Sequence, residues 1–379
     1  MISADRPETR LATRLAFLAA GFGIASWAPL VPFAKHRLGI DDGQLGLLLL
    51  CLGVGSVISM PLTGILSARF GSKPIIIAGG LGLALILPLL SLANSPWMLG
   101  PVLLVFGASL GSLDVAMNIH AVDVERAANR PLMSGFHALF SVGGFAGATL
   151  MTLLLSFHLG AFASSLLCSV LLTLAIVGAW PRLLRATHVQ EGPLFVMPHG
   201  IVLVLAGLAA IMFLAEGAIL DWSALLITDK ALVTKAQGGL GYTLFASAMT
   251  IGRLSGDAIT ARIGDRATLI WGGLIAIFGF IVLLLMPVPL IALSGFLLIG
   301  LGASNVVPVL FRLAGAQRAM PSPLAIAAIT TTGYAGILLG PAGVGFVAKG
   351  VGLPVAFGLL AVLICAVPVC ARLVTTRHS

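Results

Sequence analysis

Charged residues are scarce in this sequence. Asp, Glu, Lys and Arg together make up 9% of its 379 residues, whereas hydrophobic residues make up 59%. A water-soluble domain usually carries about 25% charged residues, so this composition excludes an ordinary soluble globular protein. The lipid bilayer, rather than water, is therefore the solvent that we expect around most of the chain.

The motifs of several other function classes are also missing. The sequence has no GxxxxGK[ST] phosphate-binding loop, so we do not expect ATP to drive it directly, and it has no HExxH metal site. We expect neither a disulfide nor a zinc site, because all four cysteines lie in apolar stretches: Cys51, Cys168, Cys365 and Cys370. These absences predict a protein that is not an enzyme and that needs no cofactor or metal.

A basic stripe of the kind that binds nucleic acid is absent as well. The formal net charge is +8, but the 21 Lys and Arg residues are dispersed in short loops without interleaved aromatics. With both termini placed in the cytoplasm, most of these residues fall in loops on the cytoplasmic side, which is the usual topology of an inner-membrane protein. The charge therefore predicts a multi-pass protein of the inner (plasma) membrane and no nucleic-acid partner.

Long apolar runs recur along the whole chain. Each is long enough to cross a hydrocarbon core of about 30 Å at about 1.5 Å per residue. The runs cover residues 11–33, 43–67, 74–93, 97–120, 133–156 and 160–179, and then 200–225, 238–261, 268–286, 289–311, 324–347 and 354–373. We therefore predict an all-α membrane protein with twelve transmembrane helices in two pseudo-symmetric six-helix bundles, residues 1–190 and 191–379, with both termini cytoplasmic.

An internal repeat supports two related halves. The hexapeptide that spans residues 68–73, Ala-Arg-Phe-Gly-Ser-Lys, recurs 193 residues later as Ala-Arg-Ile-Gly-Asp-Arg. Short turns of this kind need Gly for a tight reversal and cations that stay in the headgroup region. We expect gating or structural roles for five residues of the two turns: Arg69, Gly71, Lys73, Arg262 and Gly264.

The first of these turns resembles a family signature. Residues 64–73, Gly-Ile-Leu-Ser-Ala-Arg-Phe-Gly-Ser-Lys, are similar to the G-x-L-a-D-R-x-G-x-K loop of the major facilitator superfamily, although Ala68 replaces the usual Asp. This resemblance implies a transporter whose two halves alternate access to a central site. In the second copy Asp257 stands at the first motif position, one turn from Arg253, so the two can neutralise each other or form a gate that makes and breaks.

Asp114 and Asn118 are the leading candidates for substrate and proton binding. They lie four residues apart in an apolar segment, so they share one helical face. A charge at a helix centre costs about 2.5–3.5 kcal/mol, and burial favours the neutral carboxyl, which suits Asp114 to carry a proton. The pair resembles the fourth helix of the fucose permease branch, where an acid and this Asn lie at the sugar site. The alternative is a hydrogen bond to a neighbouring helix.

Other polar residues in apolar segments are weaker candidates. Glu216 is interpreted as a second proton or hydroxyl-binding group or as structural, and Trp222 as a sugar-stacking ring or an interfacial anchor. The first helix carries Trp27 but lacks the acid of the fucose permease branch, so that branch's two-acid mechanism does not transfer. Three further candidates are Asn305 and Tyr334, as hydroxyl partners, and His137, as a proton relay or part of a cytoplasmic polar lock.

These observations predict a secondary active transporter. It would move a small polar, sugar-like solute by alternating access, in symport with protons, with the proton gradient as its energy source. A proton-driven exporter of drugs or metabolites is the alternative, since the chain has only two tyrosines and few intramembrane amides. The expected partners are the small-molecule substrate, protons and the lipid bilayer, and the expected state is a monomer.

Overall fold

The regular structure is helical throughout the described part of the chain. This computed structural model describes residues 6–40, 42–184, 197–233 and 240–376, and no strand occurs within them. The helices of the first half are α1 (Pro7–Trp27), η1 (Ala28–Leu30), α2 (Val31–Leu38), α3 (Asp42–Phe70), α4 (Ser72–Leu92), α5 (Pro96–Ala128), α6 (Met133–Ser156), α7 (Ala161–Ala179) and η2 (Trp180–Arg182). Those of the second half are α8 (Ile201–Asp229), α9 (Leu240–Leu285), α10 (Pro289–Ala303), α11 (Val306–Ala316), α12 (Ser322–Val351), α13 (Leu353–Ile364) and α14 (Ala366–Thr375). The all-α prediction is thus confirmed for these residues.

Eleven helices of the described chain are long and apolar enough to cross a membrane. One of them, α9, is 46 residues long and contains two of the apolar runs predicted from the sequence. At 1.5 Å per residue it would measure about 69 Å, more than twice the thickness of a hydrocarbon core. Its backbone is non-helical at Gly264 (φ 80°, ψ 164°), so α9 consists of two helices joined there. The count of twelve crossings and the side of the termini stay predictions.

The chain divides into two compact units. Unit 1 comprises Met1–Arg130, Phe136–Met197 and Met320–Thr331, and unit 2 comprises Pro131–Gly135, Pro198–Ala319 and Thr332–Ser379. The beginning of α6 therefore groups with unit 2, and the beginning of α12 groups with unit 1. The predicted boundary between residues 190 and 191 lies outside the described residues, so that division remains our proposal.

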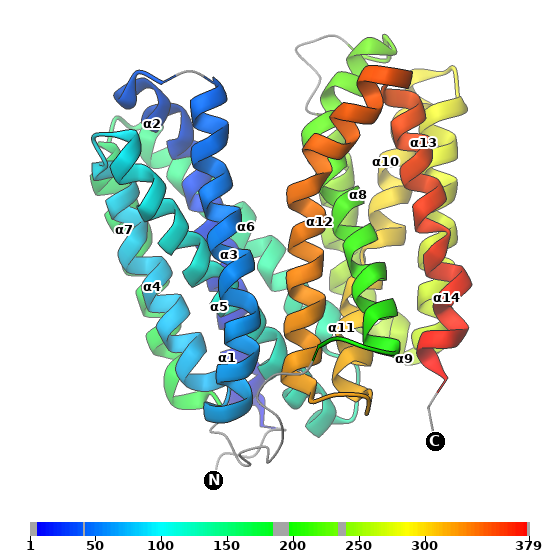
Figure 1. Ribbon diagram of the computed structural model, residues 1–379, viewed down its shortest axis with the longest axis horizontal. Coiled ribbons are helices and arrows are strands. Elements are labelled where there is room, and N and C mark those ends of the chain that lie inside the picture. Colours follow the sequence, from blue (N-terminus) through cyan, green and yellow to red (C-terminus); the bar gives the residue numbers. More distant parts are fainter. Residues whose placement is uncertain (1–5, 41, 185–196, 234–239, 377–379) are drawn as a thin grey trace. The chain divides into compact units, whose positions relative to one another are not determined.

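Helix α5 lies at the centre of unit 1. It packs along α3 and α4 and contacts α1, and α7 packs against α1 and α4 (Figure 1). Phe106 of α5, Phe17 of α1 and Leu83 of α4 are fully buried. Helices α3 and α5 approach closely because small residues line their contact: a Cβ added at Gly107 would lie 1.9 Å from the carbonyl oxygen of Leu52. This packing holds the polar face of α5 in a fixed position.

Helix α9 is the corresponding centre of unit 2. It packs against α10 and also contacts α8, α11, α13 and α14. The rings of Phe280 on α9 and Phe357 on α13 lie 6.2 Å apart, and both are fully buried. Helices α8 and α13 also pack against each other in this unit.

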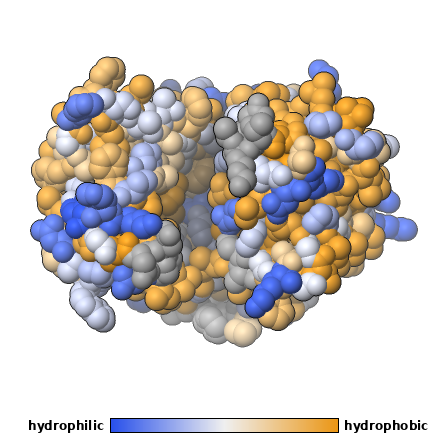
Figure 2. Space-filling model, turned by 90° about the horizontal axis from the view of Figure 1, so that it is seen from above, coloured by the Kyte–Doolittle hydropathy of each residue, from blue (hydrophilic) through white to orange (hydrophobic). Residues whose placement is uncertain are grey.

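The outer surface carries many large apolar side chains. Examples that are more than half exposed are Leu85, Trp97, Phe145, Leu290 and Phe346. In the end-on view of Figure 2, hydrophilic residues gather in patches among hydrophobic ones. Exposed apolar side chains suit contact with lipid, whereas polar patches suit the headgroups and water.

The internal repeat has the same geometry in both units. Gly71 (φ 78°, ψ 167°) and Gly264 (φ 80°, ψ 164°) occupy equivalent turns with matching dihedral angles, which only glycine adopts readily. Each turn ends one helix and starts the next within its unit. The sequence repeat therefore reflects a structural repeat.

The same spacing of 193 residues relates two cationic helix caps. The Arg37 guanidinium donates from Nε to the Ala93 carbonyl at 3.0 Å and from Nη2 to the Leu90 carbonyl at 2.9 Å, at the end of α4. The Lys230 ammonium donates to the carbonyls of Leu283 at 3.1 Å and Leu284 at 2.7 Å, at the end of α9. These bonds satisfy carbonyls that a helix end leaves without partners. Desolvation by burial lowers the pKa of Lys230.

We predict that Lys230→Met lowers the stability of the protein. The substitution keeps an unbranched side chain but removes the donor to two carbonyls, and a hydrogen bond to a charged group contributes about 1.5–3 kcal/mol. The apparent melting temperature in detergent is the measurement. Lys230→Arg, which keeps donors at this position, is the control and should melt close to the parent protein. An unchanged melting temperature in Lys230→Met would contradict a capping role.

Candidate functional site

Asp114 and Asn118 form one polar pair on α5. Asn118 Nδ2 donates to the Asp114 carbonyl oxygen at 2.9 Å and to Asp114 Oδ1 at 3.2 Å. Asp114 is 8% exposed and Asn118 is 0% exposed. The shared helical face that the sequence predicts is therefore observed, with the carboxyl and the amide in contact.

The amide oxygen of Asn118 is the unusual atom of this pair. Among the residues that the structure describes, Asn118 Oδ1 is buried and has no hydrogen-bond partner. A buried acceptor without a donor costs about 1–3 kcal/mol, and the cost falls if a hydroxyl or a protonated group donates to it. Trp27 Nε1, also in unit 1, is a second buried group that lacks a partner within the same described ranges.

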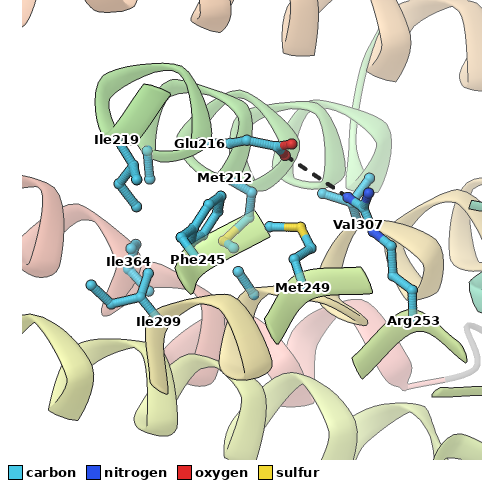
Figure 3. Close-up of a pocket in the computed structure, with 11 residues that line it drawn as sticks. Met212, Glu216, Ile219, Phe245, Met249, Arg253, Ile299, Val307 and Ile364 are labelled. Atoms are coloured by element: carbon cyan, nitrogen blue, oxygen red, sulfur yellow. Dashed lines mark ion pairs between the residues drawn. The ribbon is translucent and has the colours of Figure 1, made fainter. Parts of the chain in front are cut away.

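Unit 2 contains a cavity with an ion pair on its wall. The cavity is small, with room for about one water molecule, and helices α8, α9, α10, α11 and α13 line it. Figure 3 shows Glu216 of α8 directed toward Arg253 of α9 beside the side chains of Met212, Phe245 and Met249. Glu216 Oε2 lies 3.9 Å from Arg253 Nη2.

The cavity is otherwise apolar. Its remaining lining residues are Ala215, Ile219, Ile299, Ala303, Val307 and Ile364. Met249 lies one turn and Phe245 two turns before Arg253, so the three side chains share one face of α9. That spacing is visible in the sequence and would have identified this wall, which the sequence analysis missed.

Asp257 caps a helix. Its Oδ1 accepts from the Ser134 amide and its Oδ2 from the Gly135 amide, both at 2.9 Å. These amides belong to the first turn of α6, where N–H groups lack intrahelical partners and an anion is favourable. The predicted pairing of Asp257 with Arg253 stays a prediction, and the contact of Arg253 in the cavity is with Glu216.

Asn305 connects α9 to the start of α11. Its Nδ2 donates to the Gly252 carbonyl at 3.1 Å and to Ser304 Oγ at 3.0 Å. Its amide oxygen lies so close to Gly256 that a Cβ added there would be 1.7 Å away. Asn305 does not line the cavity, and these contacts hold two helices together; a role in solute binding stays a prediction.

The two aromatic candidates of unit 2 lie between α8 and α12. The indole of Trp222 packs against Gly345, where an added Cβ would lie 2.8 Å from the ring. The rings of Tyr334 and Phe213 lie 6.3 Å apart. Neither Trp222 nor Tyr334 lines the cavity.

The histidines and Lys73 are placed in unit 1. His137 makes an edge contact with Phe17 at 5.2 Å between ring centroids. His120 Nε2 accepts from the Leu184 amide at 3.0 Å, and its Nδ1 lies 3.1 Å from Thr13 Oγ1. Lys73 Nζ donates to the Leu183 carbonyl at 3.3 Å. His120 and Lys73 thus hold the chain where it leaves η2.

The two predicted loop arginines are exposed, and a further ion pair lies beside the second loop. The Arg69 guanidinium lies 5.2 Å from the ring centroid of Phe70, and Arg262 is exposed. Asp265, which follows Gly264, pairs with Arg312 of α11. The sequence analysis did not predict this pair.

Within the described residues, no cluster of three or more His, Cys, Asp or Glu could hold a metal ion.

Comparisons with known proteins agree on one family. A sequence model of the Major Facilitator Superfamily matches residues 15–321. An uncharacterized MFS-type transporter of Yersinia pestis is 50% identical over 367 residues, which cover 97% of this chain and 96% of that protein. Two solved structures share the fold. The E. coli fucose:proton symporter FucP has a TM-score of 0.77 at 16% identity, over 99% of this chain and 100% of that one. The human organic anion transporter MFSD10 has a TM-score of 0.76 at 18% identity, over 97% of this chain and 100% of that one.

We predict that Gly256→Ala destabilises unit 2 because its methyl group would overlap the Asn305 amide. Overpacking of this kind costs about 1–3 kcal/mol. Gly207→Ala is the control, since nothing lies within 4 Å of a Cβ at that helical position. Adding Asn305→Ala to Gly256→Ala should recover part of the lost melting temperature. A Gly256→Ala protein that melts like the Gly207→Ala protein would contradict the close approach.

We also predict that Asp257→Ala lowers stability by about 0.5–2 kcal/mol, the range for loss of a helix N-cap. Asp257→Asn keeps an acceptor but loses the charge and should show an intermediate effect. The melting temperature in detergent is measured for both. Asp229→Asn, at the exposed end of α8, is a matched control with no expected change. The cap assignment fails if all three variants melt together.

Proposed function

Because this chain belongs to the Major Facilitator Superfamily, we propose that it is a secondary active transporter that moves a small polar, sugar-like solute by alternating access, in symport with protons. Family membership makes it a multi-pass transporter of the plasma membrane, and members of this superfamily are transporters rather than enzymes. The solute, the proton coupling and the direction are the parts that we propose.

One observation carries the proposal: the buried Asp114–Asn118 pair with its unsatisfied amide oxygen. Asp114 is a buried carboxyl within a membrane-spanning helix, a kind of group that serves proton relays in transporters. The acceptor at Asn118 Oδ1 suits a solute hydroxyl, which would supply the missing donor. A proton and a hydroxyl-bearing solute can therefore bind on one helical face.

The apolar cavity of unit 2 favours a second candidate, a proton-driven exporter of drugs or metabolites. Nine of its eleven lining residues are hydrophobic, which suits a cargo with an apolar body. The two candidates differ in direction. A symporter carries solute in the same direction as protons, so solute accumulates in proteoliposomes whose lumen is more alkaline than the medium. A proton-driven exporter carries cargo in the direction opposite to protons.

The expected result for Asp114→Asn is loss of uphill uptake with retention of exchange. Uphill uptake of labelled sugar is followed in sugar-free proteoliposomes under a pH gradient, and exchange is followed without a gradient in proteoliposomes loaded with unlabelled sugar. The neutral amide keeps the hydrogen bonds that position Asn118 but cannot carry a proton, so accumulation should vanish while sugar-for-sugar exchange continues. Asp221→Asn, an exposed acid on α8, is the control and should accumulate normally. Undiminished accumulation in Asp114→Asn would refute the coupling role.

A further inference from the structure

A buried histidine of unit 1 has no part in the transport site proposed above. His120 of α5 is 1% exposed, and both nitrogens of its ring have partners. The Leu184 amide can only donate, so Nε2, which lies 3.0 Å away, accepts and carries no proton. The ring is therefore neutral, and its proton lies on Nδ1.

Thr13 of α1 continues the same series of hydrogen bonds. Its Oγ1 donates to the Thr9 carbonyl at 3.0 Å, so the hydroxyl accepts from His120 Nδ1 at 3.1 Å. The donors run in one direction, from the Leu184 amide through the ring and the hydroxyl to a carbonyl of α1. The ring cannot gain a second proton without losing one of these bonds.

The segment that this ring holds is the one that leaves unit 1. Leu183, which is fully buried, and Leu184 follow η2, and along the chain unit 2 continues from Pro198. Lys73 Nζ donates to the Leu183 carbonyl at 3.3 Å. We call Leu183 and Leu184 the strap. One residue of the strap is held by α4 and the other by α5.

Helix packing alone does not require this histidine. Helices α5 and α10 begin 193 residues apart, so the spacing of the internal repeat relates them as well. That spacing places Leu313 and Ala206 of unit 2 at the positions of His120 and Thr13. The repeated helices thus accept apolar side chains at these positions, and the polar series of unit 1 serves the strap.

A proton on Nε2 would break this arrangement. The ring would then present an N–H group to the N–H of Leu184, so that two donors would face each other. It would also carry a positive charge near Lys73, which acts electrostatically on the ring. A docked strap and a charged ring are therefore incompatible.

We propose that His120 is an acid-sensitive clamp, which holds the strap while its ring is neutral and releases the strap when the ring takes up a proton. Release exposes the imidazole to water, and an exposed histidine titrates near its ordinary pKa of about 6.5. Release therefore becomes easier as the pH falls below about 6.5, by up to tenfold per pH unit, and is independent of pH well above that value. The clamp depends neither on the solute nor on the proton coupling proposed above.

Other ionisable groups lie on the elements around His120. They are Asp114, Asp123, Glu125 and Arg126 on α5, Glu8, Arg10 and Arg14 on α1, Cys51 and Arg69 on α3, Lys73 on α4, His137 on α6, Cys168 on α7 and Arg182 on η2. Lys73 is the charge in the described chain that acts on the ring, and it opposes a proton there.

Hydrogen–deuterium exchange at the Leu184 amide tests the clamp. The full-length protein in nanodiscs is labelled at several values between about pH 5 and pH 8, with residue-level fragmentation and correction for the intrinsic effect of pH on exchange. We expect the protection of this amide to be constant above about pH 6.5 and to fall by up to tenfold per pH unit below it.

Two amide variants separate the clamp from a simple contact between helices. In His120→Gln, Oε1 reaches the place of Nε2 and accepts from Leu184 but binds no proton, so protection should persist at every pH. The shorter side chain of His120→Asn reaches Thr13 but not Leu184, so protection should fall by about two- to tenfold at neutral pH. His36→Gln replaces an exposed histidine of α2 and is the control, which should behave as the parent does.

Nitrogen NMR of protein with isotopically labelled histidine gives an independent readout. Subtraction of the His120→Gln spectrum isolates the signals of the His120 ring. At neutral pH we expect the neutral ring with its proton on Nδ1.

Three results would overturn the inference: equal protection of the Leu184 amide in the parent and in His120→Asn, protection in the parent that does not change with pH, or a His120 ring whose proton lies on Nε2. If His120→Asn does not fold, the parent and His120→Gln still decide, since the same pH dependence in both would exclude the clamp. None of these measurements requires transport, so their outcome is separate from that of the symporter proposal.

Discussion

A polar group inside a bilayer-crossing helix must find its partner within the protein, because hydrocarbon offers neither donors nor acceptors. The structure meets this constraint in several ways. Asn118 donates to its helical neighbour Asp114, Asp257 accepts from the free amides at the start of α6, and Lys230 donates to carbonyls at the end of α9. Each of these contacts also fixes one helix end or one helix face. The hydrogen bonds that satisfy the polar groups therefore also position the helices.

One polar group of the proposed site is incompletely satisfied. Asn118 Oδ1 is buried and lacks a donor within the described residues. A transporter has to bind and then release, so its site cannot consist of groups that are fully satisfied in one state. The caps and packing glycines provide a stable scaffold, and in our proposal the Asn118 amide oxygen keeps hydrogen-bonding capacity for a solute.

Local pattern predicted most of the fold and part of the site. The apolar runs predicted the helices because run length alone decides whether a segment can cross a bilayer, and the Asp114–Asn118 contact followed from a spacing of four residues. The cavity partner of Arg253 did not follow. Asp257 lies one turn away on the same helix, but Glu216 on α8 reaches the guanidinium only through tertiary packing. Likewise, nothing in the sequence indicates that Asn305 lies against Gly256.

The pair of cationic caps bears on how the chain arose. Arg37 and Lys230 occupy equivalent places in the two units and serve the same helix end, yet they are different amino acids. If both halves descend from one duplicated ancestral segment, then what each copy has retained is a donor for exposed carbonyls, while the chemical identity of that donor has drifted. For this pair, the position of the contact is the same in the two halves, whereas the amino acid that makes it differs.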